Sequence, residues 1–277
     1  RSHMRQLSVQ EGTLFLLAVW FLLALLGMLP FHLAGLHLSP VDTFFECISA
    51  LTTTGMTTLG NTLPPSLILW RGLMSWFGGL LFIVILVSVL PVVGGCFGMD
   101  FNVRQERLFS PLWNRMTRPM REMMLLYSAI TLVSVLIYLA AGDEIFPALI
   151  LALFTISSGA GPMTGGLAPL PSLMLGAGIV SLLSALPLLT LRQFFRRRSG
   201  VGLTRHMELR SFFALLLAAG VLLSVLPMLH GTQSAADAVA YGFFYAISFL
   251  STNGLMLQDE ISFHGGSELL LILLAVI

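Results

Sequence analysis

One sequence pattern occurs twice in the chain, with its copies 199 residues apart. The first copy, at 44–55, reads Phe-Phe-Glu-Cys-Ile-Ser-Ala-Leu-Thr-Thr-Thr-Gly, and the second, at 243–254, reads Phe-Phe-Tyr-Ala-Ile-Ser-Phe-Leu-Ser-Thr-Asn-Gly. Each copy is an apolar segment too short to cross a bilayer, followed by small hydroxyl residues and a glycine. A repeat this specific predicts that the two segments adopt the same local structure.

The composition places these segments in a membrane. Hydrophobic residues make up 56% of the chain and charged residues 10%, whereas about a quarter of the residues in an average soluble domain are charged. Long uncharged runs, each near or above the ~20 residues that span a bilayer, occupy 13–35, 72–99, 123–141 and 211–236. The uncharged run 145–191 is too long for one helix and contains several prolines, so it is expected to hold a re-entrant segment and then a spanning helix. The sequence therefore predicts an all-α integral membrane protein.

Arginines gather in two segments, and the chain has no lysine. By the positive-inside rule both segments are expected on the cytoplasmic side. The first segment holds Arg104, Arg107, Arg115, Arg118 and Arg121, and the second holds Arg192, Arg196, Arg197, Arg198, Arg205 and Arg210. The simplest role for these arginines is to set topology and contact anionic lipid. The alternative is docking of a cytoplasmic partner, for which the candidates are Arg104, Arg107, Arg196, Arg197 and Arg198.

The chain is expected to consist of three units, each with a helix, a pore loop and a second helix. Residues 1–4 resemble the remnant of an expression tag. The expected divisions are 5–96 for the first unit, 97–121 for a cytoplasmic loop, 122–195 for the second unit, 196–210 for another cytoplasmic loop and 211–277 for the third unit. The last nine residues cannot cross ~30 Å of hydrocarbon. We therefore expect the third unit to be truncated and the chain to be a fragment.

Each unit is expected to contain a half-helix, at about 42–51, 146–156 and 236–250. Asp42 is placed to cap the first of these. The second loop has two alternative registers, because either Gly161 or Gly159 can be aligned with Gly55. Gly78 and Gly79, in the helix expected after the first loop, predict close packing against a neighbouring helix.

These half-helices have the features of a cation filter. A half-helix aims the negative end of its dipole toward the bilayer centre, and non-helical backbone is tolerated there where it lines a water-filled path or is buried in protein. Glycine permits backbone angles that turn carbonyls toward an ion, and these oxygens replace its hydration shell. Glu46 has two alternative roles, to shape the field near the outer vestibule or to hydrogen-bond a neighbouring loop as scaffold. No nucleophile–base pair is recognisable, so no enzymatic activity, cofactor, transition metal or nucleic-acid partner is expected.

The residues resemble the Trk/Ktr/HKT superfamily of potassium transporters. The resemblance is carried by 46–57 with Thr-Thr-Thr-Gly, and by 69–91, where Trp70-Arg71 and Trp76-Phe77-Gly78-Gly79 precede an apolar run closed by Pro91. Glu11-Gly12 and the segment 27–30 fit it too. The resemblance implies potassium uptake through one pore shared by four repeats, in a multi-pass protein of the bacterial inner membrane. It also implies a homodimer and a cytoplasmic nucleotide-binding regulatory subunit. It assigns potassium-binding filter carbonyls to Thr52, Thr53, Thr54, Gly55, Ser158, Gly159, Ala160, Gly161, Ser251, Thr252, Asn253 and Gly254.

The chain departs from the family pattern in three ways. The fourth repeat is absent, the returning helix of the third is cut short, and the second and third loops match the first only loosely. Because three loops cannot surround a pseudo-fourfold pore, this chain alone is not expected to conduct selectively. Two hypotheses remain, a potassium uptake subunit and a degenerate, non-conducting family member that acts as a membrane scaffold or sensor.

Overall fold

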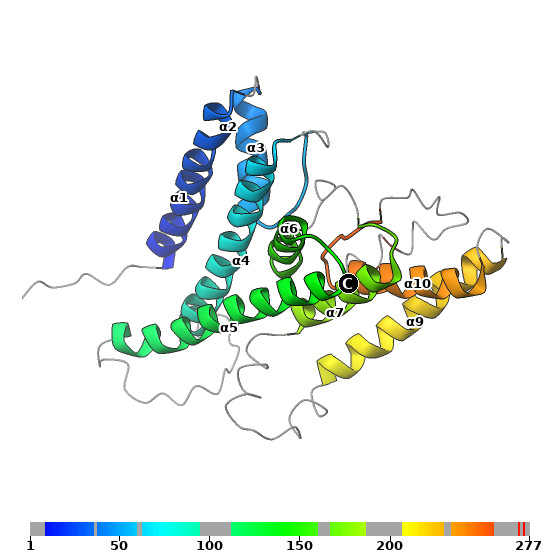
Figure 1. The fold of residues 1–277 in the computed structure, drawn as a ribbon. Coiled ribbons are helices and arrows are strands. Elements are labelled where there is room, and N and C mark those ends of the chain that lie inside the picture. Colours follow the sequence, from blue (N-terminus) through cyan, green and yellow to red (C-terminus); the bar gives the residue numbers. More distant parts are fainter. Residues whose placement is uncertain are drawn as a thin grey trace, which may run out of the picture.

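The computed structural model describes residues 9–35, 38–59, 63–94, 112–159, 167–186, 207–229 and 234–257, together with Leu271 and Leu274. The secondary structure in these ranges is helical apart from one isolated bridge between Leu167 and Leu257. The helices are α1 (Val9–Gly27), α2 (Leu29–Leu33), α3 (Pro40–Leu51), α4 (Pro65–Gly94), α5 (Leu112–Ala140), α6 (Ile145–Ile156), α7 (Pro171–Ala185), α9 (Met207–Leu229) and α10 (Ala235–Leu250) (Figure 1). The prediction of an all-α fold is therefore confirmed.

The described helices differ widely in length. Within the described ranges, three helices contain a segment long and apolar enough to cross a membrane, at Pro65–Ile83, Arg121–Ala140 and Arg210–Met228. By contrast, α3 and α6 have 12 residues each, which at 1.5 Å per residue gives about 18 Å, well short of the hydrocarbon thickness. Helices α3 and α6 can therefore enter the bilayer without crossing it.

Two expected helix boundaries shift in the structure. The first apolar run is divided into α1 and α2 at Met28, because Pro30 occupies one of the first two positions of α2, where a missing N–H costs no hydrogen bond. Helix α5 begins at Leu112 and not at Met123, so Arg115, Arg118 and Arg121 lie on a helix. The first ten residues of α5, Leu112 to Arg121, therefore fall within the cytoplasmic loop expected at 97–121. The shortened returning helix expected for the third unit lies outside the described residues, apart from Leu271 and Leu274.

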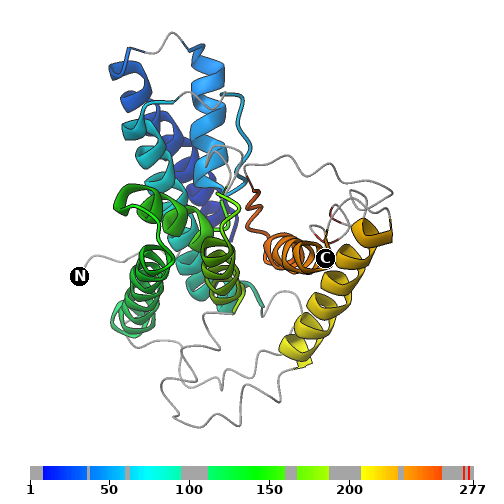
Figure 2. The ribbon, with the colours of Figure 1, turned by 45° about the vertical axis from the view of Figure 1, so that its right-hand side comes forward.

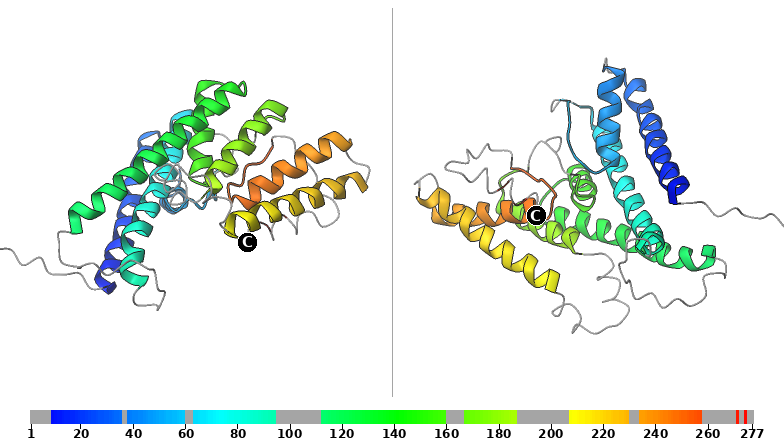
Figure 3. Two further views of the ribbon diagram at one scale, coloured as in Figure 1. Left: turned by 90° about the horizontal axis from the view of Figure 1, so that it is seen from below. Right: turned by 180° about the vertical axis from the view of Figure 1, so that it is seen from behind.

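The helices form two packed groups joined by the middle ones. Helices α1, α3 and α4 lie together, α9 and α10 run side by side, and α5, α6 and α7 lie between these sets (Figures 1 and 2). One core cluster joins α5, α6, α7, α9 and α10, and a smaller one, around Phe31, Cys47 and Met74, joins the first helices. The view from below and the view from behind both show α10 reaching the middle of the molecule at its C-terminal end (Figure 3).

The short helices α3 and α10 start with the same cap. Ser39 precedes α3, and its Oγ accepts a hydrogen bond from Asp42 N at 3.1 Å. Ser234 does the same for Asp237 N at 3.3 Å before α10. The prediction that Asp42 is the cap is therefore wrong. Ser39 is the N-cap, and the Asp42 carboxylate lies in the first turn, where it favours the helix dipole.

Removing this cap is expected to weaken α3. Ser39→Ala leaves a helix-end N–H without its side-chain acceptor, and such losses cost about 1 kcal/mol. We therefore expect a melting temperature a few degrees lower in detergent, whereas Ser39→Thr, which keeps the hydroxyl, should melt close to the unsubstituted protein. An unchanged melting temperature for Ser39→Ala would contradict the capping assignment.

Two adjacent glycines let α4 pack closely on its neighbours. A Cβ added at Gly78 would overlap the carbonyl oxygen of Leu51, at the end of α3. A Cβ added at Gly79 would lie 2.8 Å from the Tyr127 hydroxyl of α5. The expected close packing at Gly78 and Gly79 is therefore confirmed.

Candidate functional site: three helix-terminal loops

Helix α3 ends in a Schellman motif that leads into the first candidate filter loop. Thr53 N donates to Ala50 O at 3.0 Å, and Thr54 N donates to Ser49 O at 2.9 Å. These two bonds satisfy carbonyls that a helix C-terminus otherwise leaves without partners. The motif requires a left-handed residue just after the cap, and Thr53 takes this conformation with φ of 55°.

Helices α6 and α10 end in the same motif. The equivalent bonds after α6 run from Ser158 N to Thr155 O at 3.2 Å and from Gly159 N to Phe154 O at 2.9 Å. Those after α10 run from Thr252 N to Phe249 O and from Asn253 N to Ser248 O, both at 3.0 Å. The loops that follow these three short helices, which are far apart in sequence, therefore begin with the same backbone geometry.

This geometry is strained at the same position in each loop. Among the described residues, the only non-glycine residues with positive φ are Thr53, Ser158 and Thr252, at 55°, 56° and 57°. A β-branched residue rarely adopts such angles, and strained backbone of this kind clusters at functional sites. Two positions later, Gly55 and Gly254 also have positive φ, at 75° and 66°. The repeated strain indicates that the loop conformation serves a purpose beyond ending a helix.

The shared motif also aligns the second loop with the first. Ser158 corresponds to Thr53, so Gly159 corresponds to Thr54 and, by sequence, Ala160 corresponds to Gly55. The alignment of Gly159 with Gly55 is therefore wrong, because Gly159 N makes the hydrogen bond that Thr54 N makes in the first loop. Ala160 and Gly161 themselves lie outside the described residues.

The first loop leaves several backbone oxygens without hydrogen bonds. In the part of the chain that the structure describes, the carbonyl oxygens of Thr52, Thr53 and Gly55 accept none. Met56 O, by contrast, accepts hydrogen bonds from Ser49 Oγ at 2.6 Å and from Arg71 Nη2 at 2.5 Å. The carbonyls at and before the glycine are therefore available to a ligand, whereas the next one is bound to protein.

Glu46 and Arg71 form a buried ion pair behind this loop. Glu46 lies on α3 and is 0% exposed, Arg71 lies on α4 and is 1% exposed, and Nε of Arg71 is 3.1 Å from Oε2 of Glu46. Glu46 Oε1 accepts from Thr58 N at 2.6 Å and from Thr57 Oγ at 2.9 Å. The sequence singled out Glu46 but not the role of Arg71, although a lone charge in the apolar segment Pro65–Ile83 is a signal for it.

Hydrogen bonds connect the second and third loop regions to helices of the preceding repeat. Ser75 Oγ of α4 lies 2.8 Å from Ser157 Oγ at the end of α6. Asn253 Nδ2, in the third loop, donates to Ser184 Oγ of α7 at 3.0 Å. The segments after the second and third loops also pair, because Leu167 N donates to Met256 O at 2.7 Å. These contacts bring the end of α6 and the third loop against helices of the preceding repeat.

The remaining predicted residues lie in the third loop or outside the described residues. Ser251 caps α10, is buried and begins the third loop, which continues through Gly254. The arginines proposed for partner or lipid contact, Arg104, Arg107, Arg196, Arg197 and Arg198, lie outside the described residues. Within the described ranges, no three His, Cys, Asp or Glu side chains gather where they could hold a metal ion.

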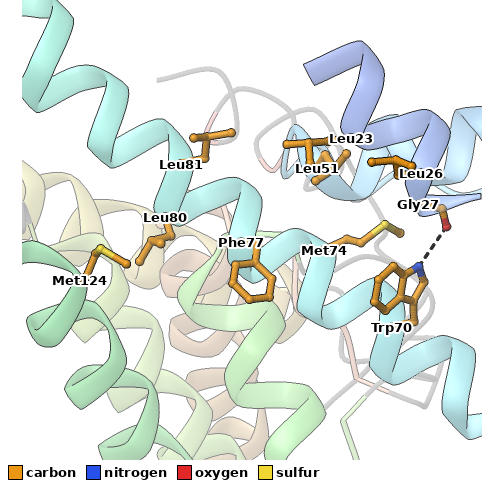
Figure 4. Close-up of a pocket in the computed structure, with 10 residues that line it drawn as sticks. All are labelled: Leu23, Leu26, Gly27, Leu51, Trp70, Met74, Phe77, Leu80, Leu81 and Met124. Carbon is orange, nitrogen blue, oxygen red and sulfur yellow. Dashed lines mark hydrogen bonds between the residues drawn. The ribbon is translucent and has the colours of Figure 1, made fainter. Parts of the chain in front are cut away.

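An apolar cavity of about 370 Å³ lies between α1, α3, α4 and α5 (Figure 4). It is lined by Leu23, Leu26, Gly27, Leu51, Trp70, Met74, Phe77, Leu80, Leu81 and Met124. The Trp70 Nε1–H donates to Gly27 O at 3.0 Å, drawn as the dashed line in Figure 4. These side chains offer no oxygen ligand. The loop carbonyls are therefore better ligands for a dehydrated cation than the lining of this cavity.

Comparisons with known proteins match the chain to one family. Residues 1–156 match the family model TrkH, described as a cation transport protein. The chain is 29% identical to the Trk system potassium uptake protein TrkG of Escherichia coli K12 over 272 residues, which cover 93% of this chain and 55% of TrkG. It is 33% identical over 167 residues to TrkH of the same organism, covering 57% of this chain and 34% of TrkH.

The fold agrees with a solved structure of the same group. The crystal structure of the potassium transporter TrkH from Vibrio parahaemolyticus matches 99% of this chain with a TM-score of 0.81 and 26% identity, and the match covers 57% of the TrkH chain. The chain therefore spans little more than half the length of TrkG and of this TrkH. These relatives are transport proteins, which agrees with the prediction that the chain is not an enzyme. The chain belongs to the TrkH family of cation transport proteins.

Proposed function

We propose that the chain supplies three pore loops to a potassium uptake path, in which backbone carbonyls hold a dehydrated K⁺. The observation that carries this proposal is the identical strained Schellman motif at the ends of α3, α6 and α10. The proposed ligands are the carbonyl oxygens of Thr52, Thr53, Thr54, Gly55, Ser158, Gly159, Ala160, Gly161, Ser251, Thr252, Asn253 and Gly254.

Elementary electrostatics supports a cation at this place. The C-terminus of each short helix carries partial negative charge, and several such ends reinforce one another in a low dielectric. Carbonyl oxygens bind a monovalent cation strongly enough to replace its water and weakly enough to release it. A carboxylate in direct contact would hold the ion more tightly, and the nearest buried one in the first loop region, Glu46, is already paired with Arg71.

The relatives support potassium as the transported ion. TrkG and TrkH of E. coli are potassium uptake proteins by name, and the solved TrkH is a potassium transporter. Because this chain spans only 55% of TrkG, the uptake activity is proposed for the full-length protein. We further propose a bacterial inner-membrane location, a homodimer, lipid contacts through the arginines, and a cytoplasmic nucleotide-binding regulatory subunit.

Flux measurement tests this proposal. The full-length protein, purified and reconstituted into liposomes, is expected to carry K⁺ and Rb⁺ down an imposed gradient. Empty liposomes and liposomes with heat-denatured protein provide the background. Flux no greater than this background, with or without the regulatory subunit, would contradict potassium transport.

A second candidate function is favoured by the second loop. Its register places Ala160 where the other loops have Gly55 and Gly254, and it has Leu151 and Phe154 at the positions of Glu46 and Ser49. A loop without these features suits a degenerate family member that acts as a membrane scaffold or sensor without conducting. The flux experiment separates the two candidates, because any protein-dependent K⁺ flux eliminates this one.

A further inference from the structure

The Glu46–Arg71 pair is poorly explained as a source of stability. Both side chains are almost completely buried, and removing two charges from water costs more than their attraction commonly returns. Arg71 Nη1 is buried and finds no hydrogen-bond partner in the described part of the chain, and the Nε–Oε2 contact falls outside hydrogen-bond geometry. Apolar residues would fill the same space without the free-energy cost of desolvating two charges. The role of the pair is therefore inferred from its other contacts.

Those other contacts all go to the segment that follows Gly55. Arg71 Nη2 donates to Met56 O at 2.5 Å. Glu46 Oε1 accepts from Thr58 N at 2.6 Å and from Thr58 Oγ at 3.2 Å. The two charges therefore bind consecutive peptide groups of the segment that leaves the first loop.

The first loop is consequently held at both ends. Before Gly55, the Schellman bonds of Thr53 and Thr54 attach it to α3. After Gly55, the ion pair attaches it to α3 through Glu46 and to α4 through Arg71. The free carbonyls lie between these attachments. Inward movement would break backbone hydrogen bonds at the end before Gly55 and charge-assisted hydrogen bonds at the end after it.

The third loop has the same attachment without the charges. At an offset of 199 residues, Ser248 Oγ donates to Leu255 O at 2.8 Å, as Ser49 does to Met56 O at 2.6 Å. Tyr245 takes the position of Glu46, and its hydroxyl accepts from Leu257 N at 3.5 Å. Both loops are thus attached at equivalent backbone positions. The ion pair is found at the first loop, where the equivalent hydrogen bonds are shorter.

We propose that Glu46 and Arg71 are positioning residues that give the first loop its preference for K⁺ over Na⁺. This inference rests on the proposed function, in which the loop carbonyls bind the ion. Na⁺ is smaller than K⁺, so carbonyls must move inward to coordinate it, and the ion pair opposes that movement. Cavity size and the number and field strength of the carbonyls are competing explanations of K⁺ selectivity, and this loop provides a specific test of the first.

The variant Arg71→Lys in the full-length protein tests the positioning role. Lysine keeps the charge that compensates Glu46, but it lacks the planar guanidinium fork whose Nε lies beside Glu46 Oε2 while its Nη2 donates to Met56 O. In cells that lack their own potassium uptake systems, we expect the ratio of K⁺ to Na⁺ uptake to fall about tenfold, the size expected for one lost hydrogen bond to a charged group. The maximal K⁺ uptake rate should change less than this ratio. Arg121→Lys, an exposed site on α5, is the matched control.

A charge-neutral double variant separates positioning from folding. Glu46→Gln alone leaves Arg71 buried without a counter-charge, so poor membrane insertion is expected. Combining Glu46→Gln with Arg71→Met removes both charges and should restore insertion while the K⁺ to Na⁺ ratio stays low. Glu144→Gln, at an exposed carboxylate before α6, is the control. If Arg71→Lys does not insert into the membrane, the K⁺ to Na⁺ uptake ratio of the double variant tests the positioning role in its place.

The outcomes distinguish this inference from the proposed function. An inserted Arg71→Lys or double variant with the K⁺ to Na⁺ ratio of the unsubstituted protein would overturn the positioning role alone. Absence of K⁺ uptake by the unsubstituted protein would instead refute the proposed function. A reduced ratio in the variants with normal ratios in both controls is the expected result.

Discussion

Replacing Gly55 with arginine is expected to reduce potassium uptake by the full-length protein to the background of cells without a potassium system. Gly55 is buried and left-handed, with φ of 75°, so any side chain strains the backbone there. The guanidinium also brings a positive charge to the proposed ion path. At ~6 Å and an effective dielectric constant of 20, this charge repels K⁺ by about 3 kcal/mol, which lowers ion occupancy roughly a hundredfold.

Gly35 provides a matched control for this substitution. It is also left-handed, with φ of 71°, and a Cβ added there meets no atom within 4 Å. Gly35→Arg therefore introduces the same charge and similar strain outside the loops, and it should support normal uptake. Gly55→Ala, which adds backbone strain without charge, should give a potassium uptake rate between those of Gly55→Arg and Gly35→Arg. Normal uptake by a correctly inserted Gly55→Arg would contradict the assignment of this loop to the ion path.

Replacing Gly78 with alanine is expected to separate α4 from the end of α3. The added methyl group would overlap the carbonyl oxygen of Leu51, which is backbone and cannot rotate away. Overpacking of this kind costs about 3 kcal/mol, which corresponds to a melting temperature about 10 °C lower in detergent. Because Leu51 directly precedes the first loop, uptake should fall as well.

Gly72, one and a half turns earlier on α4, is the control for this effect. A Cβ added there would lie 3.5 Å from a Phe154 ring carbon, which is ordinary van der Waals contact. Gly72→Ala should therefore melt close to the unsubstituted protein. Equal melting temperatures for Gly72→Ala and Gly78→Ala would show that the close approach of α3 and α4 is not as tight as the structure indicates.

The helical fold was predictable because its signals are local. Long uncharged runs predict spanning helices, and the paired glycines at 78 and 79 predict a close approach that the structure contains. The sequence did not predict that Ser39 caps α3, because Asp42 is an equally good capping residue three positions later. The greater length of α10 was predictable, because the half-helices expected at about 42–51 and 236–250 correspond to α3, with 12 residues, and to α10, with 16.

The site was less predictable because its details are tertiary or run against residue preferences. The register of the second loop was sought from glycines, but the left-handed residue is Ser158, and nothing in the sequence marks a serine for that conformation. The partnership of Glu46 with Arg71 joins residues on different helices. Glu46 was expected either to shape the outer field or to hydrogen-bond a loop backbone, and its contact with Thr58 N favours the second alternative.

The central claim is that the three loops bind a dehydrated monovalent cation through backbone oxygens. It is tested most directly by crystals of the full-length protein grown in Tl⁺ or Rb⁺, with the ion located by anomalous scattering. The account predicts a peak in contact with carbonyl oxygens of residues 52–55 and 251–254 at once. A transport-competent protein whose ion instead lies against side chains, away from both Gly55 and Gly254, would contradict it.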